Sequence, residues 1–252
     1  MLFDMGHVLY MVISTLVIVG LLVLSKVFVK EQERKNKILK IAAIVTVILH
    51  YSNLYVEYFS SGSALVENSE LLPIYPCHIA MWLLVAIAFW KKREGILYKI
   101  VTEFTFYLGV AGGILGILLN IAYESNPNLA DWYVLKGLLS HSTMLFGCIY
   151  LFIGDYVKIR VNNIKSMGVG LVCMLIHAVL VIGLFEAFHL DPPNAMYLLG
   201  VPFEAPKWFN TWTIGCLIFV ALFIVTSLYE YFRLPKEERW YIKLKQRNNK
   251  NI

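Results

Sequence analysis

Cys77 is the residue of this sequence best placed for nucleophilic chemistry. It follows two prolines and begins an apolar stretch. Proline suits the first turn of a helix, where free N–H groups and the helix dipole favour a thiolate. A thiolate needs a base to take its proton; His78 is adjacent, and His141 can reach Cys77 from another stretch. The other cysteines lie inside apolar stretches and are expected to act as small hydrophobes: Cys148, Cys173 and Cys216.

Further polar residues fall inside apolar stretches, where the loss of hydration makes them costly and marks them as candidates for function. We expect most of them to gather in one half of a bilayer and to form a site that opens outward. Structural roles are the alternative: His50 can bond to Asn53, and His177 can satisfy a carbonyl of a kinked neighbour. Glu103, near the opposite face, is expected to pair with Lys99. The candidate supporting or substrate-binding residues are His78, Asn120, His50, Asn53, His177 and Asn194.

The composition says what kind of molecule must position these residues. Hydrophobic residues make up 59% of the 252 residues and charged residues 15%, and the mean hydropathy is +0.66. In ordinary globular domains, hydrophobic residues make up roughly 45–50% and charged residues about 25%. Because a soluble fold of this size needs more polar cover, the composition excludes a soluble domain, a disordered chain and a nucleic-acid-binding domain. It predicts an integral membrane protein.

The sequence predicts an all-α bundle of about seven transmembrane helices, because seven apolar stretches approach or exceed the roughly 17–25 residues that a membrane helix needs. The first stretch is too long for a cleaved signal peptide. No linker or convincing repeat divides the chain, so a single domain over 1–252 is expected, with a basic tail over 233–252. The expected spans are about 7–29, 38–59, 74–90, 100–122, 135–154, 167–189 and 211–232.

The basic residues predict the orientation. Twenty of the 22 lysines and arginines fall on one side of an alternating seven-span arrangement, and only Lys136 and Lys207 fall on the other. Cytoplasmic loops carry the excess of Lys and Arg, so the N-terminus is expected outside and the C-terminus in the cytoplasm. A run of glycines in the fourth span, with Gly112 and Gly116 at small-xxx-small spacing, predicts close helix packing within the bundle.

Several motifs, taken in order, resemble those of a known family. They are a glycine-rich span closing at Asn120, the Ser140-His141-Ser142 segment, the loop from Pro193 to Leu198, and the run Leu72-Pro73-Ile74-Tyr75-Pro76-Cys77-His78. Together they resemble the YwaF family, also described as transmembrane protein 164-related integral membrane acyltransferases. The likeness covers spans two to seven. Many bacterial members place a histidine before the cysteine, whereas here His78 follows Cys77, which is closer to the eukaryotic branch.

The resemblance implies a seven-span bundle that transfers fatty acyl groups between lipids through a cysteine acyl-enzyme. Cys77 would be the nucleophile and His141 its general base. The implied partners are a phospholipid donor and a lysolipid or similar acceptor, with no nucleic acid, no metal and no organic cofactor; hydrolysis is the same chemistry with water as acceptor. The sequence is compatible with a homo-oligomer but does not indicate one. If the cell is bacterial, the expected location is the plasma membrane.

Two other functions fit parts of the sequence. A solute-binding or transport protein would use the outward polar cluster to hold its ligand, with Cys77 incidental. An intramembrane metal-dependent hydrolase would need a zinc site, for which His50, His141 and His177 are the candidate ligands. Seven-span lipid amidases share a pair of histidines on the last span. The last span of this chain contains no histidine, which counts against a metal-dependent hydrolase.

Overall fold

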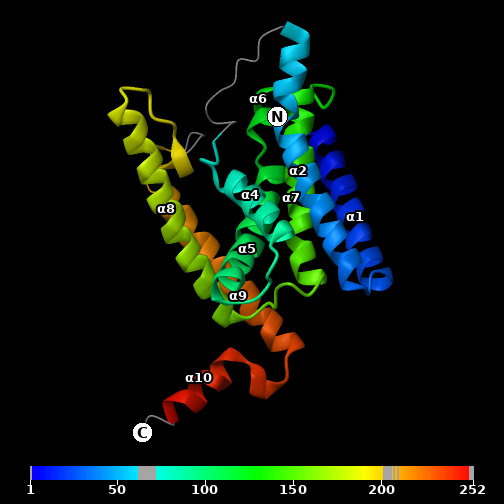
Figure 1. Ribbon diagram of the computed structural model, residues 1–252, viewed down its shortest axis with the longest axis vertical. Helices are drawn as coiled ribbons and strands as arrows, with labels where there is room; N and C mark the ends of the chain where they lie inside the picture. Colours follow the sequence, from blue (N-terminus) through cyan, green and yellow to red (C-terminus); the bar gives the residue numbers. More distant parts are fainter. Residues whose placement is uncertain (1, 62–71, 201–205, 207, 209, 250–252) are drawn as a thin grey trace.

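The described part of the chain is helical, without strands. A computed structural model describes residues 2–61, 72–200, 206, 208 and 210–249 (Figure 1). Among the residues used above, Lys207 lies outside the described residues, as do positions 250–252 of the basic tail.

Six helices are long and apolar enough to cross a membrane, which confirms the predicted multi-pass helical bundle. Most begin or end within a few residues of the expected spans, and their polar ends extend beyond the apolar stretches. The two chain ends lie at opposite ends of the bundle (Figure 1). The six helices are α1 (Met5–Phe28), α2 (Gln32–Ser61), α5 (Ile96–Leu118), α7 (Trp132–Ile153), α8 (Ile164–Ala187) and α9 (Thr211–Arg233).

The span expected at 74–90 is shorter than predicted. Helix α4 covers Pro76–Phe89, which is 14 residues or about 21 Å at 1.5 Å per residue, whereas the hydrocarbon core is about 30 Å thick. Proline lacks an N–H and restricts the residue before it, so Pro73 and Pro76 keep residues 72–75 out of the helix. We call residues 72–75 the lead-in segment. Helix α4 therefore begins deeper in the bundle than its neighbours begin or end (Figure 1).

The span expected at 100–122 is interrupted. Helix α5 ends at Leu118, and the chain resumes as the short helix α6 (Ile121–Ser125). Asn120 is the N-cap of α6, and its side-chain oxygen accepts a hydrogen bond from the Tyr123 N–H at 2.9 Å. The remaining short elements are the 3-10 turns η1 (Val161–Asn163), η2 (Ala195–Tyr197) and η3 (Lys236–Glu238), and helix α10 (Trp240–Asn249).

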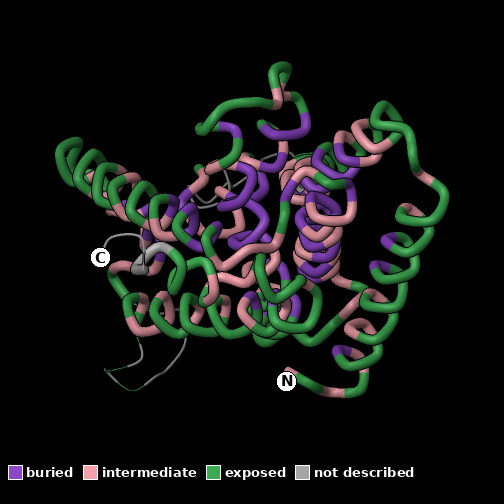
Figure 2. Tube along the Cα trace, turned by 90° about the horizontal axis from the view of Figure 1, so that it is seen from below, coloured by how far each residue is buried: buried purple, intermediate pink, exposed green. Residues whose placement is uncertain are grey.

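Helices α5 and α7 form the centre of the bundle and carry the largest share of its buried residues. The long outer helices are mostly exposed (Figure 2): α1 buries only His7, Ile18 and Leu22. Their exposed surfaces are apolar, as expected of helices that face lipid tails, which are as apolar as leucine.

Small residues let α5 and α7 approach closely, as the sequence predicts for packing within the bundle. A Cβ atom on Gly109 would lie 2.1 Å from the Cys148 sulfur, and one on Gly113 would lie 2.8 Å from Leu145 Cβ. Gly116, of the predicted small-xxx-small pair, also packs closely against α7, because an added Cβ would lie 2.0 Å from His141 Cδ2. Gly112 does not pack against a neighbouring helix in this way but lines a cavity, with Met144 Cε 3.9 Å from its added Cβ.

Candidate functional site

A cavity of about 1170 Å³ lies between α4, α5, α7, α8 and α9, and we call it the main cavity. Pockets for drug-sized ligands are typically about 300–1,000 Å³, so the space suits a larger ligand. Its lining is both polar and apolar. The polar residues include His50, Cys77, His78, Asn120, Glu124, Lys136, His141 and Tyr197; the apolar residues include Leu108, Leu115, Met144, Met167, Leu171, Met174 and Ile218.

Cys77 occupies the first turn of α4. Tyr75 is the N-cap and Pro76 the first helical residue. The first backbone bond of the helix runs from the Ile79 N–H to the Tyr75 carbonyl at 3.1 Å. The N–H groups of Cys77 and His78 precede that bond, so they are available to an anion at this end of the helix.

The lead-in segment is irregular backbone whose carbonyls are satisfied by side chains and by another loop. His78 Nδ1 lies 3.1 Å from the Leu72 carbonyl oxygen, and His177 Nε2 lies 3.2 Å from that of Pro73. The Ile74 carbonyl accepts from the Met196 N–H at 2.8 Å. Unsatisfied backbone groups are costly at membrane depth, so these bonds allow irregular backbone to reach into the bundle. They thereby hold Cys77, which follows the lead-in segment, at the cavity.

His141 is fixed on both sides of its ring. Nδ1 lies 2.8 Å from the Gly137 carbonyl oxygen, so it carries the proton and donates, which leaves Nε2 as the acceptor nitrogen. The other side faces Gly116, where an added Cβ would lie 2.0 Å from Cδ2 and 2.4 Å from Nε2. Only a glycine at position 116 leaves room for the ring in this position.

Asn120 connects the two glycines that hold His141. Its side-chain N–H donates to the Gly116 carbonyl at 3.3 Å, and Nδ2 lies 3.4 Å from the position of a Cβ added at Gly137. The carboxamide therefore stabilises the break between α5 and α6 at the point where both approach α7.

Four rings that line the main cavity contact one another in a row. The His50 and His78 rings meet edge to face with their centres 4.4 Å apart, and the centres of the Tyr75 and His78 rings are 5.2 Å apart. Tyr75 also stacks on Tyr197 at 4.9 Å. These contacts join α2, the start of α4 and the loop before α9.

Three of the proposed supporting residues lie outside the cavity lining. Asn53 is buried on α2, and His177 binds the lead-in segment, in the carbonyl-binding role considered as the alternative. Asn194 closes its own loop, donating to the Gly200 carbonyl at 2.7 Å and accepting from the Leu199 N–H at 3.0 Å.

Away from the site, Glu103 pairs with Lys99 at 3.9 Å, as predicted, and accepts from the Ser166 hydroxyl at 2.6 Å.

Lys136 and Tyr197 are among the cavity residues that the sequence did not mark as candidates. Lys136, counted only as an outward basic residue, lies on α7, is 6% exposed and has its ammonium 4.7 Å from the Tyr133 ring centre. Its position five residues before His141 in an apolar span was the available signal. Tyr197 has a left-handed backbone with φ 56°, as does Met196 with φ 53°, and such strain gathers at functional sites. The sequence carries no signal for it.

The three histidines considered as zinc ligands do not share a site, since His177 binds the lead-in segment whereas His50 and His141 line the main cavity. Across the ranges that the structure describes, no group of three or more His, Cys, Asp or Glu side chains could hold a metal ion.

The six helices that are long and apolar enough to cross a membrane define an integral, multi-pass membrane protein of the helical-bundle class. The chain belongs to the TMEM164 family, whose family model matches residues 2–231. This confirms the predicted relation to transmembrane protein 164. No curated protein and no solved structure matches the chain.

Proposed function

We propose that this protein is a lipid acyltransferase that moves a fatty acyl group between lipids through a thioester on Cys77. The observation that carries the proposal is that Cys77, at a helix N-terminus, and His141, with Nε2 as its acceptor nitrogen, line the same cavity. The resemblance to the YwaF family supports the same pair.

The reaction begins when His141 Nε2 takes the proton of the Cys77 thiol. The thiolate attacks the ester carbonyl of a donor phospholipid, the ester C–O bond breaks, and the released lysolipid oxygen takes the proton back from His141. In the second half, His141 takes the proton of an acceptor hydroxyl as its oxygen attacks the thioester carbonyl. The C–S bond breaks, and the released Cys77 thiolate takes the proton back from His141. The Gly137 carbonyl supports the imidazolium formed in each half, because it accepts from Nδ1.

The surroundings suit a lipid substrate. Negative charge on the carbonyl oxygen would be stabilised by the N–H groups of Cys77 and His78 at the start of α4. Lys136 supplies a cation for a headgroup phosphate. The apolar lining follows α5 from Leu108 to Leu119, about 16 Å along the helix axis, and suits an acyl chain.

The test is acyl transfer by the full chain in lipid nanodiscs. Cys77→Ser should abolish transfer, and His141→Ala should lower its rate by about 10²–10⁴-fold, the usual contribution of a general base. Cys173→Ser is the matched control, since Cys173 is exposed on α8 and away from the cavity lining; its rate should be unchanged. Retained transfer by Cys77→Ser would refute the mechanism and favour a binding or transport role.

A further inference from the structure

A second cavity, which we call the basic pocket, lies at the opposite end of α4 from Cys77. Its volume is about 560 Å³, and it shares no lining residue with the main cavity. It is formed where α2, α4 and α5 meet the loops that carry many of the basic residues. Three cations line it: Lys40, Lys91 and Arg93.

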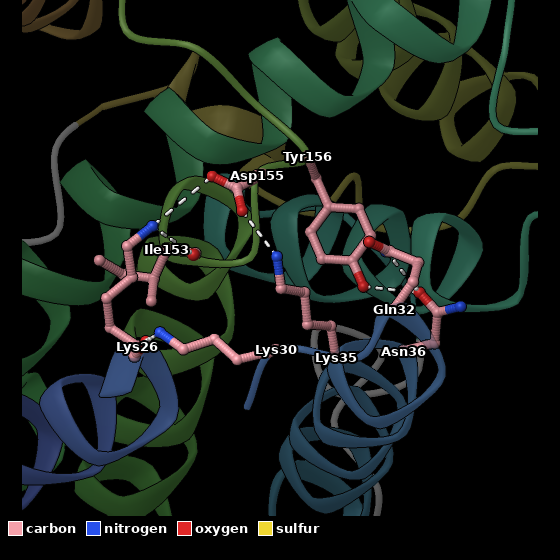
Figure 3. Close-up of polar contacts among 8 residues, drawn as sticks. All are labelled: Lys26, Lys30, Gln32, Lys35, Asn36, Ile153, Asp155 and Tyr156. Carbon is pink, nitrogen blue, oxygen red and sulfur yellow. Dashed lines mark hydrogen bonds and ion pairs between the residues drawn. The ribbon is translucent and has the colours of Figure 1, made fainter. Parts of the chain in front are cut away.

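The positive charge of the basic pocket is not cancelled by Asp155, an acidic residue that also lines it. Asp155 is already bound by Lys35 at 2.6 Å and by Lys26 at 3.6 Å (Figure 3). The Lys35 ammonium holds the pKa of Asp155 below its usual value, so this carboxylate stays ionised and paired with the two lysines. Within the described ranges, no ion pair joins the three lining cations to a carboxylate.

The guanidinium of Arg93 is held in place. It donates to Asn36 Oδ1 and to the Ala88 carbonyl and lies 5.1 Å from the Tyr156 ring centre. Asn36 Oδ1 also accepts from the Tyr156 hydroxyl at 2.7 Å and from Gln32 Nε2 at 3.2 Å (Figure 3). A guanidinium has five N–H donors, so an ordered Arg93 keeps donors for an anion.

We infer that the basic pocket binds the phosphate-bearing headgroup of an anionic phospholipid from the cytoplasmic leaflet. A lipid is favoured over a soluble phosphate because Phe89 and Trp90, at the end of α4, line the same pocket, and the Lys40 ammonium lies 5.3 Å from the Phe89 ring centre. Basic pockets between helices on the cytoplasmic side bind such headgroups. The inference does not depend on the proposed acyltransferase activity.

The test measures binding of dioctanoyl phosphatidic acid to the purified full chain in maltoside detergent. Lys91→Gln and Lys40→Gln should each raise the dissociation constant about fivefold, because both lysines line the pocket. The matched control is Lys92→Gln, which removes the same charge from the next residue, outside the lining, and should change the constant less than twofold.

Three results would overturn the inference. Equal losses in the Lys91 and Lys92 variants would mean diffuse surface charge rather than a pocket. Equal affinity for dioctanoyl phosphatidylcholine would remove the selectivity for an anionic headgroup. Equal affinity for glycerol 3-phosphate would identify a soluble phosphate compound as the ligand.

Discussion

His141 illustrates how single residues set the geometry of this site. Its ring is fixed by a hydrogen bond to Gly137 and by contact with Gly116. Both constraints come from residues without side chains. The proposed general base requires a ring held in one position, and these contacts hold the His141 ring without another titratable group.

Gly116→Ala should disable the site without unfolding the protein. The new methyl group would lie 2.0 Å from His141 Cδ2, so the ring must move by more than 1 Å. A displacement of that size costs on the order of 10²-fold in rate. Gly112→Ala is the control in the same helix and cavity, since its methyl would lie 3.9 Å from the nearest atom. Equal transfer rates for the two variants in nanodiscs would contradict this account.

At the scale of elements, the short helix α4 and its lead-in segment place Cys77, the proposed nucleophile, at the main cavity. The sequence predicts a cysteine at a helix start from Pro76-Cys77 alone, because the chemistry of proline and helix ends is local. It does not predict the depth of that start. The depth depends on carbonyl partners from distant elements, the His177 side chain and the Met196 N–H, which no local pattern reveals.

His177→Ala should destabilise the protein through the lead-in segment. Losing the donor leaves the Pro73 carbonyl unsatisfied, at a cost of about 1–3 kcal/mol. For a chain of this size, each kcal/mol lowers the unfolding midpoint by about 2–4 °C. His177→Gln keeps an N–H donor and should recover part of the loss. Thermal unfolding in detergent is the measurement, and unchanged midpoints in both variants would show that the bond contributes nothing.

At the scale of the whole molecule, two sites lie at the two ends of α4. The main cavity is polar beside Cys77, and the basic pocket gathers cations beyond Phe89. Composition and apolar runs predict the multi-pass bundle, because the bilayer imposes length and hydropathy on each span. They predict neither cavity, because a cavity depends on how side chains from separate helices pack.

The orientation of the bundle is a prediction of the basic residues, and labelling can test it. In a chain whose native cysteines are replaced by alanine, Glu124→Cys should react with a membrane-impermeant maleimide on intact cells. Lys92→Cys should react only after the cells are permeabilised. Both positions are exposed, so burial does not limit either reaction. The reverse pattern would invert the topology and place the main cavity toward the cytoplasm.

The central claim is that Cys77 carries the acyl group. The most direct measurement is the intact mass of the protein in nanodiscs after incubation with a labelled phospholipid and no acceptor, before and after hydroxylamine. We expect the mass to increase by one acyl chain, the increase to map to the peptide containing Cys77, and hydroxylamine to remove it. An acyl group on another residue, or transfer activity that persists without any adduct on Cys77, would contradict the account.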